Sequence, residues 1–280
     1  ELLRPKISND LKTMWPFRRR PTLEESGFFQ GFTDWHSHIL PGVDDGVQTL
    51  EESLRVLEEY ERLGVREVWL TPHIMEDIPN TTAHLRQRFQ ELQAAYSQGV
   101  PGNPAVETHS CVSANKTTSH PLASNNVVET HSCVSSEETT ASPKLTLHLA
   151  AENMLDSLFE ERLEQNDLLP IGSNGDHLLV ETSYFSPPMG MRDILQRVQA
   201  KGYHPVLAHP ERYLYMTDHA YRQLKDMGVK FQLNQFSLYG LYGKEAQKRA
   251  IALRKMDMYD YVGTDLHRLN VLRQALRWKV

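Results

Sequence analysis

Short apolar segments alternate with amphipathic helical segments from residue 32 onward, and this alternation restricts the fold of the 280-residue chain more than any other feature. Seven segments have the length and apolar content of buried parallel strands. They are residues 32–39, 67–71, 144–150, 177–183, 205–208, 230–234 and 261–264. Repeated strand-helix units predict an α/β fold, and seven of them favour a single barrel.

The helical segments carry start and stop signals. Thr49-Leu-Glu-Glu52 is a capping box that opens a stripe of Leu54, Leu57 and Tyr60, and Gly64 is placed to end that helix. Five further segments have helical spacing, at residues 81–96, 156–165, 190–200, 219–227 and 244–255. Each of these helices follows a predicted strand, as strand-helix units require.

Two stretches fall outside the alternation. We interpret residues 1–31 as an N-terminal extension, partly disordered, with residues 1–13 as added or upstream sequence before a natural start at Met14. Residues 32–280 are expected to form one barrel domain, interrupted by an insertion at residues 97–143 that is rich in Ser, Thr, Asn and Pro.

The insertion contains a repeat, in which residues 106–113 recur as residues 128–135. The repeated histidines and cysteines offer four ligands for a zinc knot, namely His109, Cys111, His131 and Cys133. The alternative is a duplicated disordered insertion. We prefer it, because the surrounding residues supply no core to hold such a knot.

Composition excludes several classes of protein. The net charge of −6 gives no support to nucleic-acid binding, since no basic run extends beyond Arg18–Arg20. No window reaches the roughly 18 consecutive apolar residues of a membrane span. The two cysteines lie in a polar stretch, which does not resemble a disulfide framework and favours a reducing, cytoplasmic location.

Histidine, aspartate or glutamate side chains stand at or just after the C-terminal ends of six of the seven predicted strands. These candidates are His36, His38, His73, Glu152, Glu181, His209, Asp265 and His267. Active sites of barrel enzymes are built at that end of the strands. Any one of the eight could be an ordinary core histidine, a helix cap or a surface charge, but together they predict one site.

His36 and His38 are two residues apart in an extended segment, so their side chains point the same way and can bind one metal. Asp44 and Asp45 follow in a glycine-containing loop, where they either cap a turn or add oxygen ligands. Converging carboxylates would repel one another without cations, which predicts metal binding. The nitrogen and oxygen ligand set suits Mn, Fe or Zn, and its size implies two or three ions.

A centre with several metal ions activates water and binds phosphoryl oxygens, so we expect phosphoester hydrolysis. Arg212, three residues after His209, is placed to contact phosphate, although a surface ion pair is the alternative. Arg268, next to His267, has the same two interpretations.

These motifs resemble the PHP (polymerase and histidinol phosphatase) superfamily. The similarity is greatest to the bacterial protein tyrosine phosphatases of capsule and exopolysaccharide operons, the CpsB/CapC type. It covers most of residues 32–270 and rests on six motifs. They are Asp-x-His-Ser-His-Ile-Leu-Pro-Gly-Val-Asp-Asp-Gly at 34–46, Thr-Pro-His at 71–73, Ala-Glu at 151–152, Val-Glu-Thr at 180–182, Ala-His-Pro-Glu-Arg at 208–212 and Gly-Thr-Asp-Leu-His at 263–267.

The resemblance implies a distorted seven-stranded barrel and a trinuclear site that is often manganese-dependent. It implies as metal ligands His36, His38, His73, Glu152, His209, Asp265 and His267, with Glu181 a further ligand or a base. Arg212 matches the arginine that holds the phosphate of phosphotyrosine. The implied substrate is the phosphorylated tail of a membrane tyrosine autokinase that controls polysaccharide export.

The chain departs from the family pattern at two places, and the sequence leaves three alternative functions open. The insertion replaces a shorter connection in the family, and a second family arginine is matched by either Arg268 or Arg273. A small-molecule phosphatase of the histidinol-phosphate type would use the same ligands. A non-catalytic binding module would not need every matched position to be a competent ligand, and a nuclease is disfavoured by the acidic balance.

Overall fold

The computed structural model describes residues 19–98 and 145–280. The first 18 residues and residues 99–144 lie outside the described part of the chain. The interpretations of Met14 and of the repeated His109, Cys111, His131 and Cys133 therefore concern residues outside that part.

The strands of the described residues pair in parallel. They are β1 (Thr33–Ser37), β2 (Glu67–Leu70), β3 (His73–Ile74), β4 (Thr146–Leu149), β5 (Glu152–Met154), β6 (His177–Glu181), β7 (His204–Ala208), β8 (Lys230–Asn234) and β9 (Tyr261–Gly263). One sheet has the order β1-β2-β4, and the other has the order β3-β5-β6-β7-β8-β9. The predicted parallel α/β architecture is confirmed.

Two predicted strands are each followed, after a break, by a short strand that was not predicted. The segment at 67–71 ends as β2 and resumes as β3 after Pro72, whose ring nitrogen has no hydrogen to donate to a neighbouring strand. The segment at 144–150 ends as β4 and is followed by β5, and Glu152 N donates to Pro72 O at 3.1 Å. Each interruption carries the chain from the smaller sheet into the larger one.

The combined sheet curls. A parallel bridge joins Ser37, at the end of β1, to Leu266, just after β9, so the two outer strands approach each other. Side chains from strands β1, β2, β6, β7 and β9 meet in one apolar cluster on the concave side, which includes Trp35, Trp69, Leu179, Val206 and Tyr261. A closed seven-stranded barrel remains a prediction.

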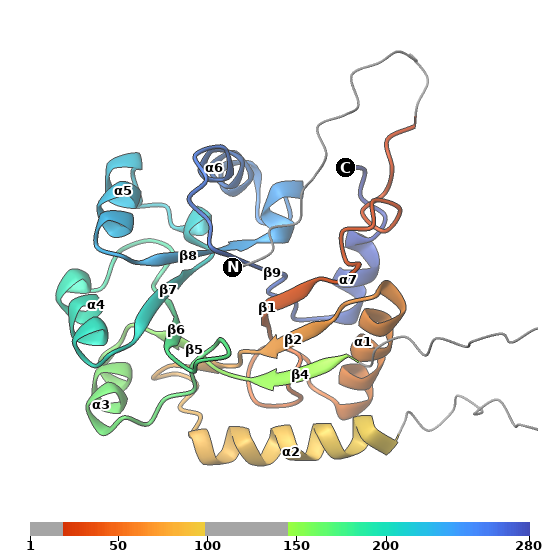
Figure 1. Cartoon of the computed structure of the whole chain (residues 1–280), viewed down its shortest axis with the longest axis horizontal. Coiled ribbons are helices and arrows are strands. Elements are labelled where there is room, and N and C mark those ends of the chain that lie inside the picture. Colours follow the sequence, from red (N-terminus) through yellow and green to blue (C-terminus); the bar gives the residue numbers. More distant parts are fainter. Residues whose placement is uncertain (1–18, 99–144) are drawn as a thin grey trace, which may run out of the picture.

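Helices lie around the outside of the curled sheet (Figure 1). They are α1 (Leu50–Leu63), α2 (Thr82–Gln98), α3 (Ser157–Gln165), α4 (Met191–Ala200), α5 (Asp218–Asp226), α6 (Lys244–Lys255) and α7 (Leu269–Ala275), with 3₁₀ turns η1 (Pro210–Arg212) and η2 (Gln235–Tyr239). The six predicted helices are confirmed, and α7 was not predicted.

Helix α1 shows how local sequence sets these boundaries. The Thr49 hydroxyl accepts a hydrogen bond from Glu52 N at 3.2 Å, and Gly64 ends the helix at a φ of 79°, which a residue without Cβ adopts readily. Leu54, Leu57 and Tyr60 are buried on one face, against the outer side of β2. The predicted Thr49 cap and apolar stripe are confirmed, whereas the reciprocal half of the capping box is not formed, because the Glu52 side chain accepts the backbone N–H of Leu269 instead.

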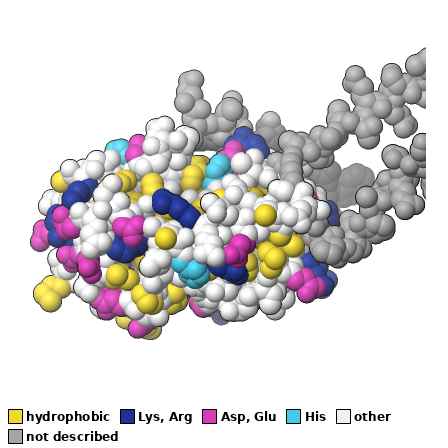
Figure 2. Space-filling view, turned by 90° about the horizontal axis from the view of Figure 1, so that it is seen from below, with side chains coloured by type: hydrophobic (Ala, Val, Ile, Leu, Met, Phe, Trp, Pro, Cys, Tyr) yellow, Lys and Arg dark blue, Asp and Glu magenta, His cyan; other side chains and the backbone are white. Residues whose placement is uncertain are grey.

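Across the part of the chain that the structure describes, no helix combines the length and the apolar character needed to cross a bilayer. On the face shown in Figure 2, basic, acidic and hydrophobic side chains are interspersed. That mixture agrees with the modest net charge of −6.

Candidate metal centre

The eight histidines and carboxylates predicted from the sequence meet at the C-terminal ends of the strands. His36 lies in β1, His73 starts β3, Glu152 starts β5, and Glu181 ends β6. The others directly follow strands, namely His38 after β1, His209 after β7, and Asp265 and His267 after β9. Seven of the eight are buried, and His267 is half-buried.

The most enclosed group consists of His36, His38, Glu152 and Asp265. The two histidine Nε2 atoms are 3.0 Å apart, and they lie 3.1 and 3.2 Å from Glu152 Oε2. The same two nitrogens are 3.5 and 3.3 Å from Asp265 Oδ1. Atoms that each bind one ion at about 2.1 Å stand roughly 3.0–3.4 Å from one another, so this spacing fits a metal site.

A second group consists of His73, Glu152 and Glu181. His73 Nδ1 lies 2.9 Å from Glu181 Oε1 and 3.2 Å from Glu152 Oε2. Yet His73 Nδ1 and Glu181 Oε1 are buried without a hydrogen-bond partner among the described residues. Close polar atoms that are not aligned as donor and acceptor are expected where both face one cation.

The third group includes Asp45, whose role as a turn cap or a ligand the sequence alone did not decide. Asp45 Oδ1 lies 3.5 Å from His73 Nε2 and 3.4 Å from His267 Nε2, and His38 completes the group. The Asp45 side chain is 66% exposed, so it closes the centre from the solvent side. The geometry thus favours the ligand interpretation for Asp45, whereas Asp44 has a different role.

Asp44 and Gln232 orient the histidines. Asp44 Oδ2 lies 2.9 Å from His38 Nδ1 and also accepts the backbone N–H of His73. Gln232 Oε1 lies 2.8 Å from His36 Nδ1 and accepts the backbone N–H of His209. In metal sites such contacts fix the ring orientation and leave Nε2 free for the ion. Gln232 was missed because its role appears only in the folded sheet, where its side chain reaches from β8 past Gly263 of β9 to His36 of β1.

A buried network ties β1 to β9. The Asp34 carboxylate accepts hydrogen bonds from the Tyr60 hydroxyl at 2.7 Å and from both the backbone and the side chain of Thr264, at 2.8 and 2.7 Å. Asp34 stands two residues before His36, and Thr264 precedes Asp265. The network therefore sets the spacing between two ligands that are distant in sequence.

His209 and Asp265 have unusual backbone conformations, with φ values of 32° and 52°. Left-handed φ values are uncommon for residues with a Cβ, and they concentrate at functional sites. His209 Nε2 lies 3.0 Å from Glu152 Oε1, so the strained backbone aims its imidazole into the centre.

Charges in the centre shift the pKa values of its members. Burial lowers the pKa of His36, but Glu152 and Asp265 outweigh that effect and raise the pKa to about 9. Burial raises the pKa of Glu152, whereas His36 and His73 hold it well below its usual range. Because a metal binds neutral imidazole and ionised carboxylate, His36 must lose a proton when a cation binds.

Arg212 and Arg268 approach the centre in different ways. Arg212 Nη1 donates to Asp265 Oδ2 at 2.7 Å, and its side chain is 17% exposed. Arg268 Nη1 donates to the backbone carbonyls of Gly46 and His267. Arg212 is thus paired with the buried carboxylate of Asp265, a predicted ligand, and not with a surface carboxylate, whereas Arg268 holds together two loops of the centre.

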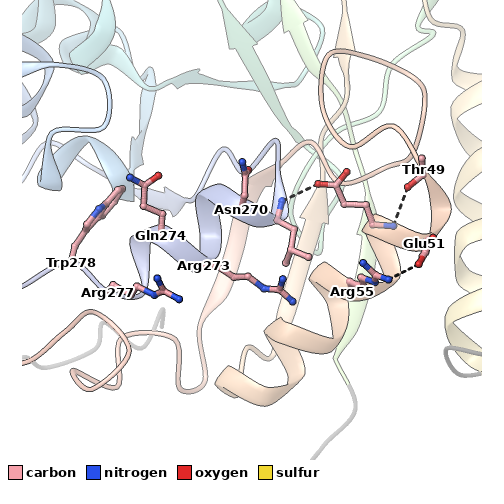
Figure 3. Close-up of a pocket in the computed structure, with 10 residues that line it drawn as sticks. Thr49, Glu51, Arg55, Asn270, Arg273, Gln274, Arg277 and Trp278 are labelled. Carbon is pink, nitrogen blue, oxygen red and sulfur yellow. Dashed lines mark hydrogen bonds and ion pairs between the residues drawn. The ribbon is translucent and has the colours of Figure 1, made fainter. Parts of the chain in front are cut away.

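Arg273 lies elsewhere. Together with Arg55 and Arg277 it lines a cavity of about 640 Å³ between α1 and α7, which Figure 3 shows. None of the eight predicted ligands lines that cavity. Of the two arginines that matched the second family arginine, Arg268 is therefore the one at the centre.

Comparison with known proteins gives a consistent result. A family model described as capsular polysaccharide synthesis, CpsB/CapC, matches residues 32–103 and 108–276. The chain is 23% identical over 239 residues to the tyrosine-protein phosphatase YwqE of Bacillus subtilis (strain 168), covering 84% of this chain and 76% of that protein. It is 26% identical over 257 residues to the tyrosine-protein phosphatase CpsB of Streptococcus agalactiae, covering 85% and 84%.

A solved structure has a similar fold. It belongs to a crystallographic study of YwqE from Bacillus subtilis and CpsB from Streptococcus pneumoniae, described there as unique metal-dependent tyrosine phosphatases. The TM-score is 0.63 at 22% sequence identity, covering 85% of this chain and 80% of the solved one. This likeness supports the α/β fold with a curled parallel sheet.

Proposed function

Because the chain belongs to the CpsB/CapC family of capsular polysaccharide synthesis, we propose that it is a metal-dependent protein tyrosine phosphatase, a phosphoric monoester hydrolase. One observation carries the proposal. The three groups of ligand atoms are linked, since each pair shares one residue, namely His38, His73 or Glu152. The relatives named tyrosine-protein phosphatases support the substrate class.

We assign the metal ligands to the predicted set, His36, His38, His73, Glu152, Glu181, His209, Asp265 and His267, and add Asp45. Glu152 has two oxygens and can bridge two ions, whereas one nitrogen of His38 binds one ion at a time. Two or three ions follow, with Mn favoured and Fe or Zn as alternatives. When bound, such ions polarise a phosphoryl oxygen and lower the pKa of a water molecule.

The protein's own groups position the substrate. Arg212 is held at the centre by Asp265, from where its remaining N–H groups reach a phosphate oxygen. Arg268 supplies a second positive charge beside His267. Glu181 and His209, both facing Glu152 or His73, are the candidates to accept or donate a proton during hydrolysis.

The wider assignments follow from the family. We propose that residues 32–280 form one distorted (β/α)7 barrel of the PHP type, and that the protein acts in the cytoplasm. Its proposed substrate is the phosphorylated tyrosine tail of a membrane tyrosine autokinase that controls capsule or exopolysaccharide synthesis. The family description, capsular polysaccharide synthesis, supports this context.

The deciding experiment combines metal analysis with substrate comparison. Protein purified without chelator and assayed with Mn²⁺ is expected to hydrolyse p-nitrophenyl phosphate and a phosphotyrosine peptide faster than histidinol phosphate. Elemental analysis of the same preparation identifies and counts the ions. Faster turnover of histidinol phosphate would favour a small-molecule phosphatase, and full activity after exhaustive chelation would exclude the metal-dependent reaction.

A further inference from the structure

Exposed apolar side chains gather on one side of the metal centre. Seven large hydrophobic side chains are exposed among the described residues, and four of them lie on three neighbouring loops. Phe185 and Met189 follow β6, Leu214 follows β7, and Leu241 follows β8. We call these four residues the apolar rim. Since β6, β7 and β8 are adjacent and parallel, their following loops share the edge of the sheet that carries the metal ligands.

Arg212 connects these loops. Its Cζ atom lies 4.5 Å from the ring centroid of Tyr184, the neighbour of Phe185, and 4.1 Å from that of Tyr242, the neighbour of Leu241. Leu214 N donates to Tyr184 O at 2.8 Å. The loops that carry the rim therefore meet at one recessed guanidinium group, which is paired with Asp265.

The two tyrosines hold that guanidinium by cation–π contact. Burial raises the pKa of both phenols above the ordinary value, so they remain neutral while Arg212 is charged. The Tyr184 ring also lies near that of His209, with 5.8 Å between the ring centroids and the planes tilted by 52°. The Arg212 guanidinium thus lies against two aromatic rings, on loops that also carry the exposed apolar side chains.

We propose that the apolar rim binds apolar residues that flank the phosphotyrosine of a peptide substrate. This inference rests on the proposed phosphatase function. The site requires an anionic group at its centre and apolar groups around it, and a phosphotyrosine between apolar residues has that arrangement. A flat membrane surface fits less well, because Arg212 is recessed behind the rim, with 17% of its side chain exposed. Exposed Phe, Met and Leu side chains grouped in this way mark an interaction surface.

The test compares two phosphotyrosine peptides of equal length and charge, one with Leu and Met beside the phosphotyrosine and one with Ser at the same positions. We expect kcat/KM to be about tenfold higher for the apolar peptide, which corresponds to roughly 1.4 kcal/mol. Phe185→Ser and Leu214→Ser are expected to bring this ratio close to one. Each variant supplies its own reference through the Ser peptide, so a loss of folded enzyme does not change the ratio.

Ile251→Ser is the matched control, because Ile251 is 39% exposed on α6 and lies outside the rim. Its ratio should equal that of the wild-type chain. A wild-type ratio near one, or a ratio that both rim variants leave unchanged, overturns the rim proposal. Sedimentation with phosphatidylglycerol vesicles that depends on Phe185 would assign the rim to a membrane instead.

If the wild-type chain hydrolyses neither peptide nor p-nitrophenyl phosphate, the proposed function fails and the rim proposal fails with it. Hydrolysis of p-nitrophenyl phosphate with a peptide ratio near one rejects the rim alone.

Discussion

At the scale of single residues, Glu152 is the most connected member of the centre. Its two carboxylate oxygens face four imidazoles, those of His36, His38, His73 and His209. Unpaired imidazoles and carboxylates in a buried place are unfavourable unless charges of opposite sign or a cation compensate them. Changes at this residue should therefore affect metal binding before they affect the fold.

Glu152→Gln keeps the size of the side chain and removes its charge. We expect kcat on p-nitrophenyl phosphate to fall at least about a thousandfold, because metal ions supply several kcal/mol of charge stabilisation. The number of bound ions, measured by elemental analysis, should fall in parallel. Glu161→Gln, on the exposed surface of α3, is the control. Retention of wild-type metal content with full activity would contradict the ligand assignment.

Gln232 acts through His36 and therefore predicts a different result. Gln232→Leu removes the partner of His36 Nδ1, and metal affinity should fall about 10–100-fold while saturating metal restores most of the activity. Competition with a fluorescent chelator measures the affinity. Gln199→Leu is the control, since Gln199 bonds a backbone carbonyl near the end of α5. Equal metal affinity in Gln232→Leu and the wild-type chain would remove the orienting role.

At the scale of elements, α1 and α7 are joined at their N-termini. Glu52 takes part in the α1 cap through its backbone N–H and accepts the N–H of Leu269 with its side chain at 3.1 Å. Leu269 follows His267 and Arg268 in the sequence. A capping residue of α1 thus also anchors the helix that follows the last ligands.

Thr49→Ala removes the oxygen that caps α1. We expect the free energy of unfolding to fall by about 1 kcal/mol, because one backbone N–H of the first turn loses its partner. Urea denaturation measures this change. Thr49→Ser, which keeps the hydroxyl, should lie within a few tenths of a kcal/mol of the wild-type value. A loss as large in Thr49→Ser as in Thr49→Ala would show that the methyl group, not the cap, stabilises the helix.

At the scale of the whole molecule, the metal centre spans both sheets. His36 belongs to β1 in the three-stranded sheet, whereas Glu152 and Glu181 belong to β5 and β6 in the six-stranded sheet. Ions held by these residues would connect the two sheets directly. Metal binding to the folded state alone stabilises that state, so metal and pH should act together on stability.

For the metal-free protein, we expect the centre to stabilise the fold most between about pH 4.5 and 6.5. Folding raises the pKa of His36 to about 9, so its contribution is complete below the ordinary value of 6.5 and is lost as pH rises toward 9. Folding lowers the pKa of Glu152, so that contribution is complete above the ordinary value of 4.5 and is lost in acid.

Urea denaturation of the metal-free protein at about pH 5.5 and about pH 9 tests the direction of this pH dependence, through the urea concentration at the midpoint of unfolding. The midpoint should be lower at the higher pH, and His36→Gln should show a smaller difference between the two. Added Mn²⁺ should oppose the alkaline loss, since metal binding requires neutral imidazoles. A midpoint of the metal-free protein that rises between these pH values would contradict the expectation.

Much of this molecule is determined by local sequence. The strand at residues 230–234 and the helix at 244–255 have the predicted boundaries, because apolar alternation and turn signals act over a few residues. The meeting of the eight predicted side chains could also be predicted, since parallel strands bring their C-terminal ends to one edge whatever their spacing in the sequence. Helix α7 was missed because its seven residues give a short apolar pattern.

Only the tertiary structure decided which side chains orient the ligands and which surround Arg212. Gln232, Tyr184 and Tyr242 carry no motif, and their contacts join loops and strands that are distant along the chain. The different contacts of Asp44 and Asp45, and the position of Arg268 rather than Arg273 beside the centre, likewise appear only in the tertiary structure. Sequence spacing sets which residues can reach one edge of the sheet, whereas the curl of the sheet sets which atoms come within 3–4 Å of each other.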